Sequence, residues 1–105
     1  MDNYLIDFQG MSWENTASGV RLKVFAEGEQ NIRLVEFSDE FVENDWCIKK
    51  HFGYVLEGSI SIDFSGKLVN FKSGNGFFIP GGEASKHKGR IAKGEKALII
   101  LVEET

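Results

Sequence analysis

The 105-residue chain, with 42% hydrophobic and 27% charged residues, has the composition of one globular domain spanning residues 1–105, which excludes a disordered or fibrous protein. Its formal net charge of −4 leaves no cationic surface large enough to follow a phosphate backbone, so we expect no nucleic-acid partner. No apolar stretch approaches the ~18 residues of a membrane span, so we expect no membrane contact. Cys47 is the one cysteine and cannot form an intrachain disulfide, and the first residues do not have the pattern of a secretion signal. We therefore expect a cytoplasmic protein.

Short runs with the composition and alternation of β-strands follow one another along the chain. They cover residues 20–25, 32–37, 46–56, 59–64, 67–71, 77–79 and 97–102. Segments rich in glycine separate them, including a Glu57-Gly58 pair that predicts a turn. Recurrent runs at this spacing predict an all-β sandwich or barrel with no helix longer than about two turns.

Two of these runs indicate how the sheet is buried. In the 59–64 run, Ile60, Ile62 and Phe64 alternate with polar residues, which predicts a strand with one buried face. The 97–102 run is apolar at every position, a pattern typical of a strand covered on both faces. The second run therefore requires two layers of structure or a partner.

Two segments resemble the signature motifs of the cupin superfamily. The first is His-Phe-Gly-Tyr-Val-Leu-Glu-Gly-Ser-Ile-Ser-Ile at 51–62, and the second is Gly-Asn-Gly-Phe-Phe-Ile-Pro-Gly-Gly at 74–82. In the second motif, Gly74, Pro80 and Gly82 occupy the structural positions of the family. The resemblance implies a small single-domain cupin with the double-stranded β-helix, or jelly-roll barrel, of that family.

The positions at which cupins usually hold a metal ion carry other residues here. Counting back from Gly58, His51 stands at the usual glutamate position, and Asp45 and Cys47 stand at the positions of the H-x-H pair. Ser85 stands at the position of the last histidine. The resemblance therefore implies the fold without the family's metal chemistry, and we expect no cofactor.

The 46–56 run has two faces of different character. Cys47, Lys49 and His51 share the face that lines the barrel interior in a cupin. The opposite face is more apolar and consists of Trp46, Ile48, Phe52, Tyr54 and Leu56. Judged by hydrophobicity alone, the apolar face would form the core and His51 would face solvent. Both interpretations hold if the apolar face packs against a second protomer, so we expect a homodimer.

The residues expected to line the pocket define the candidate site. They are Cys47, Lys49, His51, Ser85 and His87. The favoured interpretation is a pocket that binds a small polar or anionic molecule. An alternative is an enzyme in which a histidine acts as general base, or in which Cys47, His51 and His87 hold a divalent metal ion. A third is a dimerising module with a vestigial pocket.

Overall fold

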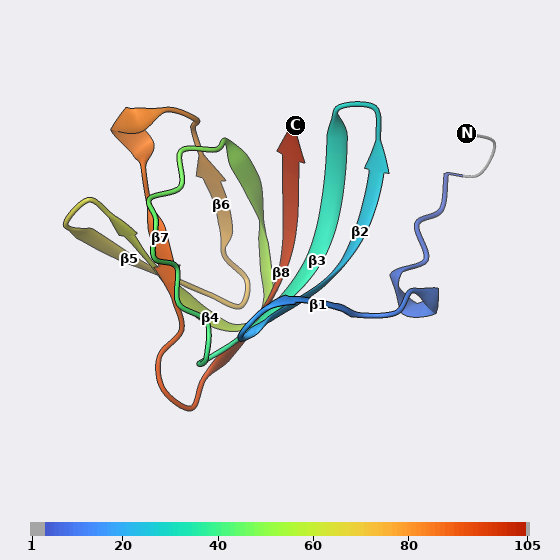
Figure 1. Ribbon diagram of the computed structural model, residues 1–105, viewed down its shortest axis with the longest axis horizontal. Coiled ribbons are helices and arrows are strands. Elements are labelled where there is room, and N and C mark those ends of the chain that lie inside the picture. Colours follow the sequence, from blue (N-terminus) through green and yellow to red (C-terminus); the bar gives the residue numbers. More distant parts are fainter. Residues whose placement is uncertain (1–3, 105) are drawn as a thin grey trace.

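The computed structural model describes residues 4–104, which form eight strands and two short 3-10 helices (Figure 1). The strands are β1 (Glu14–Ala17), β2 (Val20–Glu27), β3 (Gln30–Ser38), β4 (His51–Phe64), β5 (Lys67–Lys72), β6 (Gly76–Ile79), β7 (Lys88–Arg90) and β8 (Lys96–Glu104). The helices, η1 (Phe8–Gly10) and η2 (Glu83–Ser85), have three residues each. The expected boundaries of the domain, residues 1 and 105, lie outside the described residues.

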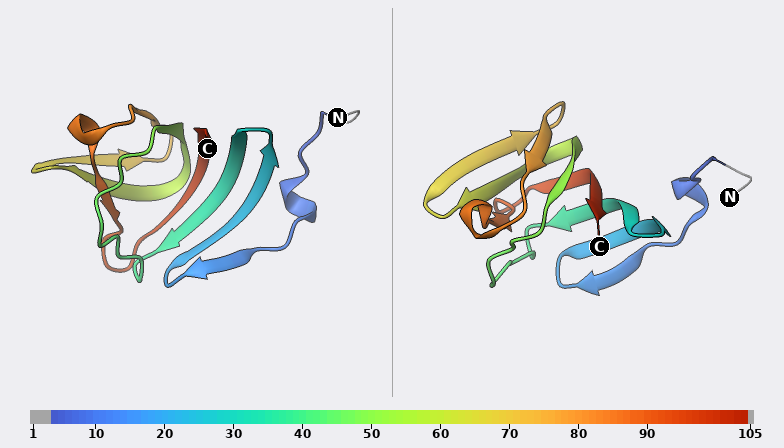
Figure 2. Two further views of the ribbon diagram at one scale, coloured as in Figure 1. Left: turned by 45° about the horizontal axis from the view of Figure 1, so that its top comes forward. Right: turned by 90° about the horizontal axis from the view of Figure 1, so that it is seen from above.

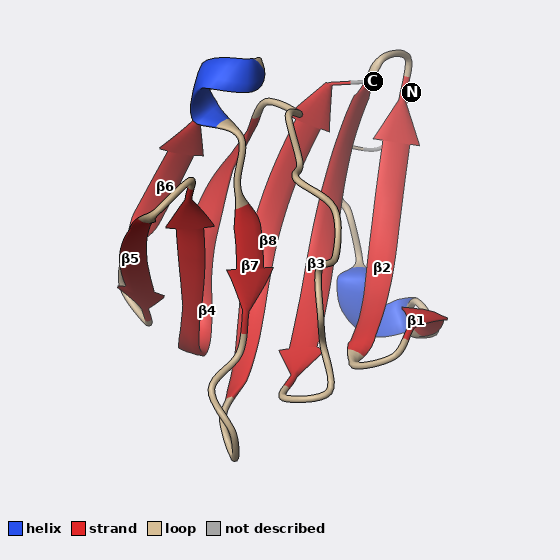
Figure 3. Cartoon of the chain, turned by 60° about the vertical axis from the view of Figure 1, so that its left-hand side comes forward, coloured by secondary structure: helices blue, strands red, loops and turns tan. Residues whose placement is uncertain are grey.

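The strands form a curled antiparallel sheet. Its hydrogen-bonded order is β1-β2-β3-β8-β4-β5, and β6 and β7 also pair with β4. The curl brings β7 and the chain that precedes β4 across from β3 and β8, which gives the sheet a concave inner side (Figures 1 and 3). The predicted all-β class is confirmed, and in the described part of the chain neither helix exceeds one turn.

Strand β4 is the element that joins the two halves of the sheet. Its first half pairs with β6 and β8, and its second half pairs with β5 and β7. The predicted turn at Glu57-Gly58 is wrong, because the strand continues through a β-bulge between Val55 and Glu57, with Gly58 at φ 74°. A bulge adds one residue and so exchanges the two faces of a strand. His51 therefore faces inward before it, and Ile60 faces inward after it.

The remaining differences from the predicted strands have local causes. Residues 46–50 are not part of β4 and make a single bridge, between Cys47 and His87, so the predicted start at residue 46 is wrong. Strands β1 and β7 were not predicted. Their sequences, Glu-Asn-Thr-Ala and Lys-Gly-Arg, are short and polar and show no apolar alternation.

Burial decides between the two interpretations of the 46–56 run. The core lies on the inner side of the sheet, and its buried apolar residues are Val35, Val55, Ile60, Ile62, Ile79, Ile91, Ala97 and Ile99. On the outer side, Phe52, Tyr54 and Phe78 remain 43%, 46% and 65% exposed. The apolar face is therefore not the core of this chain.

The N-terminal segment lies at the opposite end of the molecule from β5 (Figure 2). Lys23 on β2 anchors this segment, because its Nζ donates a hydrogen bond of 2.7 Å to the carbonyl oxygen of Phe8. The same ammonium lies 4.7 Å from the centre of the Trp13 ring. Among the described residues, no helix is long and apolar enough to span a membrane.

Candidate functional site

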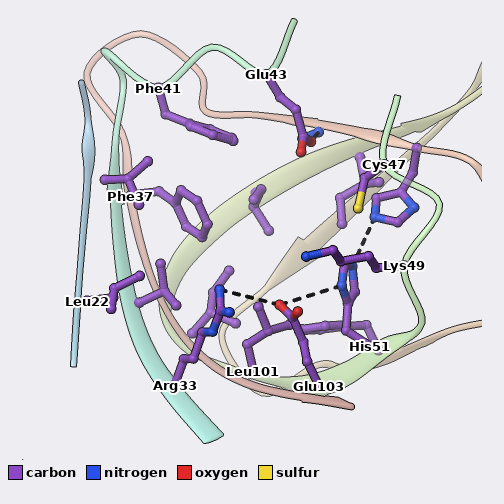
Figure 4. Close-up of a pocket in the computed structure, with 18 of the residues that line it drawn as sticks. Leu22, Arg33, Phe37, Phe41, Glu43, Cys47, Lys49, His51, Leu101 and Glu103 are labelled. Atoms are coloured by element: carbon purple, nitrogen blue, oxygen red, sulfur yellow. Dashed lines mark hydrogen bonds and ion pairs between the residues drawn. The ribbon is translucent and has the colours of Figure 1, made fainter. Parts of the chain in front are cut away.

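A cavity of about 330 Å³ lies on the concave side of the sheet (Figure 4). Strands β2, β3, β4 and β8 form its floor, and residues 41–49, which precede β4, form part of its wall. Much of the lining is apolar and includes Leu22, Val35, Phe37, Phe41, Ile62 and Leu101. The volume falls within the range of sites that bind small molecules.

Polar side chains gather at one end of this cavity. Cys47, Lys49, His51 and His87 all line it, so four of the five residues predicted from the sequence lie together. Ser85 is not among the lining residues, because residues 83–85 turn into η2 instead of continuing as an extended strand. Its carbonyl oxygen nevertheless lies 3.0 Å from Nδ1 of His87.

The sequence prediction missed two charged residues of this end, Arg33 and Glu103. Arg33 on β3 and Glu103 on β8 line the cavity, and each has an apolar residue two positions away on the same inward face, Val35 and Leu101. Nη1 of Arg33 lies 3.7 Å from Oε1 of Glu103. A charged residue that shares a strand face with apolar residues was the available signal in the sequence, but only the tertiary fold brings Arg33 and Glu103 near His51.

Backbone pairing holds two of the site residues in place. The amide of Cys47 donates to the carbonyl of His87 over 2.9 Å, and the amide of His87 donates to the carbonyl of Cys47 over 3.0 Å. Residues paired in this way on antiparallel segments project their side chains to the same face. The thiol and the imidazole therefore both enter the cavity, although residues 46–50 are not a strand.

The two imidazoles face each other directly. Their Nε2 atoms are 2.9 Å apart, and the ring planes are inclined by 80°. A carbonyl oxygen can only accept a hydrogen bond, so Nδ1 of His87 carries a hydrogen that it donates to Ser85. In the neutral ring, Nε2 of His87 is then an acceptor, and the hydrogen between the rings belongs to Nε2 of His51.

This arrangement leaves Nδ1 of His51 without a hydrogen-bond partner, although the atom is buried. Oε1 of Glu103 lies 4.0 Å away, and the Glu103 side chain is itself buried. Burial lowers the pKa of His51 to about 4, and the electrostatic influence of His87, Lys49 and Arg33 acts in the same direction. His51 is therefore a neutral base at physiological pH.

Three potential metal ligands lie in one cluster. The donor atoms of Cys47, His51 and His87 all fall within 4.8 Å of one another. Thiolate and imidazole are ligands of zinc, copper, nickel and iron, and three protein ligands leave a coordination position open. The orphaned Nδ1 of His51 fits such a site, because a histidine that binds a metal through Nε2 carries its hydrogen on Nδ1.

Comparison with known proteins identifies the fold. No family model matches the chain, and no curated protein matches it. The polyketide cyclase RemF from Streptomyces resistomycificus matches with a TM-score of 0.82 and 18% identity, over 97% of this chain and 79% of that one. The EutQ protein of Clostridium difficile matches with a TM-score of 0.74 and 20% identity, over 95% of this chain and 85% of that one.

A third structure carries the family name. It is a cupin-2 domain containing protein from Shewanella frigidimarina, with a TM-score of 0.62 and 28% identity, over 80% of this chain and 79% of that one. The matches to RemF and EutQ cover nearly the whole length of this chain, so the structural similarity includes the complete curled sheet. It also agrees with the motifs at 51–62 and 74–82. The chain therefore has the fold of a small cupin domain.

Proposed function

We propose that the cavity binds a small molecule with an apolar body and an anionic or polar head. The observation that carries this proposal is the division of the cavity into an apolar wall and a polar end. An apolar body would lie against side chains such as Phe37 and Leu101, and the head would meet Lys49 and the imidazoles. We place such a binding protein in the cytoplasm, where the thiol of Cys47 would stay reduced.

Lys49 is the side chain best placed to recognise an anionic head. It lines the cavity, and no carboxylate in the described part of the chain forms an ion pair with it. The guanidinium of Arg33, in contrast, already contacts Glu103 and donates from Nε to Asn31 over 3.1 Å. An ammonium without a counter-charge gains more from an incoming carboxylate than a cation that is already paired.

We expect Lys49→Met to weaken the binding of a simple apolar carboxylate. A hydrogen bond to a charged group contributes about 1.5–3 kcal/mol, so hexanoate should bind at least about tenfold more weakly to the variant. Isothermal titration calorimetry with hexanoate, and with hexanamide as the uncharged analogue, measures this effect. The binding of hexanamide should change little.

Lys50→Met is the matched control for this prediction. The Lys50 ammonium lies over the ring of Phe78 on the outer side of the sheet, 5.7 Å from the ring centre, so it cannot reach the cavity. The preference for an anionic head is wrong if hexanoate and hexanamide bind equally well to the wild-type protein, and the binding proposal fails if neither binds. It also fails if Lys50→Met weakens hexanoate binding as much as Lys49→Met does.

A bound metal ion is the second candidate function of the same cavity, and the cluster of Cys47, His51 and His87 favours it. The ion would act together with the small molecule rather than replace it, because the three ligand residues occupy only the polar end of the cavity. When bound, a divalent ion supplies a Lewis acid that polarises an oxygen of the bound molecule. In an enzyme of this kind, Cys47, His51 and His87 would hold the ion and Lys49 would orient the substrate.

We also propose that the protein forms a symmetric homodimer through the outer face of the sheet. Strand β8 is apolar on both faces, yet its outward residues Leu98, Ile100 and Val102 are only half-buried in this chain. The exposed rings of Phe52 and Tyr54 lie beside them on β4. A second copy would cover this surface, and a self-complementary patch closes with two-fold symmetry.

Phe52→Glu is expected to convert this dimer to a monomer, because it places a charge at the centre of the buried apolar patch. Light scattering at micromolar concentration should give twice the chain mass for the wild-type protein and the chain mass for the variant. Leu68→Glu on β5, at an apolar position in the other half of the sheet that is also exposed, should remain dimeric. A monomeric wild-type protein would rule out the dimer.

A further inference from the structure

The hydrogen bonds around the two imidazoles favour a bound cation over the metal-free arrangement. Without a metal, the one hydrogen between the Nε2 atoms leaves Nδ1 of His51 as a buried acceptor that faces the acceptor oxygens of Glu103. A buried polar group without a partner destabilises the folded protein. If both Nε2 lone pairs bound a cation, the hydrogen of His51 would reside on Nδ1 and point toward Glu103.

We propose that Cys47, His51 and His87 bind a thiophilic transition-metal ion, and that Glu103 is the positioning residue that orients the His51 ring. This inference deepens the second candidate function and rests on it, whereas the proposed binding of a carboxylate can fail independently. Two oxygen acceptors serve the site, one behind each imidazole. The Ser85 carbonyl accepts from Nδ1 of His87, and the Glu103 carboxylate lies beyond Nδ1 of His51.

The donor set selects the class of metal. Two imidazole nitrogens and one thiolate suit Zn²⁺, Co²⁺ or copper, whereas Mg²⁺ and Ca²⁺ prefer oxygen ligands. The geometry is close to what such an ion requires, because two nitrogens bound to one tetrahedral Zn²⁺ are about 3.3 Å apart. The Nε2 atoms of His51 and His87 are already at 2.9 Å. Since all three ligand residues line the cavity, an open coordination position would be accessible to a bound molecule.

Glu103 is held for this role by residues of the neighbouring strand. Arg33 on β3 lies 3.7 Å from its carboxylate, and Asn31 on the same strand accepts from Nε of Arg33. The chain of contacts from Asn31 through Arg33 and Glu103 to His51 therefore crosses β3, β8 and β4. Figure 4 shows its part from Arg33 to His51. A carboxylate behind a metal-bound histidine fixes the ring orientation and makes the ligand more basic.

The protons balance in this scheme without any further reactant. The thiol of Cys47 loses its proton to the buffer when the thiolate coordinates the ion. The hydrogen shared by the two Nε2 atoms moves to Nδ1 of His51, where it is donated toward Glu103. Binding therefore releases one proton for each metal ion, and no group is oxidised or reduced.

Titration of the metal-free protein with Co²⁺ and Zn²⁺ tests the proposal. Co²⁺ should bind in a 1:1 ratio and give the near-ultraviolet charge-transfer absorption of a cobalt thiolate. Cys47→Ser should lose this absorption. Glu103→Gln should keep the absorption but weaken metal binding about 10- to 100-fold, and Glu103→Asp should recover part of the loss. Circular dichroism of each variant shows that the β-sheet is intact.

Ser85→Ala is the matched control for this experiment. The site uses only the carbonyl group of Ser85, which alanine retains, so the variant should bind Co²⁺ like the wild-type protein. No binding of either ion at micromolar concentration, or binding without the thiolate absorption, would overturn the metal site. Unchanged affinity in folded Glu103→Gln would overturn the role of Glu103. Hexanoate binding to the metal-free protein reports separately on the carboxylate pocket.

Discussion

Replacing Gly53 with alanine is expected to destabilise the fold by about 3 kcal/mol or more, because the new methyl group would overpack a tightly joined sheet. At Gly53, β4 runs against β8 so closely that an added Cβ would overlap the carbonyl oxygen of Ile100. The same atom would lie 2.9 Å from Cζ of Phe77. This overlap can be removed only if β4 and β8 separate, and that separation would break the hydrogen bonds that pair the two strands.

Gly76→Ala is the control for this prediction. Gly76 lies on β6 opposite Tyr54, its backbone is in an ordinary conformation, and an added Cβ would make only a 3.4 Å contact. Urea unfolding followed by circular dichroism gives the free energy of unfolding of the wild-type protein and both variants. If Gly53→Ala lowers the free energy of unfolding no more than Gly76→Ala does, β4 and β8 are not so closely packed at Gly53.

Acidification of the metal-free protein is expected to reduce its free energy of unfolding by about 3 kcal/mol through His51 alone. The pKa of His51 is lowered from 6.5 to about 4 by burial and by neighbouring positive charge. Above pH 6.5 the ring is neutral in both the folded and the unfolded chain, so it contributes no pH dependence. Between pH 6.5 and 4 only the unfolded chain binds the proton, and stability falls until the folded protein is protonated too.

His51→Gln isolates this contribution from that of the carboxylates, which also titrate in acid. The titratable or charged groups that face His51 are His87, Cys47, Lys49, Arg33 and Glu103, and all remain in the variant. Urea unfolding is measured at intervals between pH 7 and 4 with a chelator present. The free energy of unfolding should fall more steeply with decreasing pH in the wild-type protein than in His51→Gln. Parallel curves for the two proteins would contradict a buried, neutral His51.

The amino-acid sequence by itself determined the class of the fold, and its resemblance to cupins implied that Cys47, Lys49 and His51 face inward, as they do in the structure. Alternation in the 59–64 run placed Ile60 and Ile62 in the core, where the structure has them. Glycine and proline at fixed positions in the 51–62 and 74–82 segments were enough for the resemblance to cupins. These features are local, because strand periodicity and turn residues act over a few neighbouring positions.

Only the tertiary structure decided how the site is assembled. The bulge after Val55 is stabilised by pairing with β8, a strand some forty residues away, so the sequence near Glu57 and Gly58 resembled a turn instead. A prediction from hydrophobicity alone would place the face that carries Phe52 in the core, although this face is exposed. The hydrophobic pattern of one strand does not show which of its faces a distant part of the chain will cover. The meeting of His51 with Glu103 has the same origin, since long-range strand register, and not local pattern, brings β4 and β8 together.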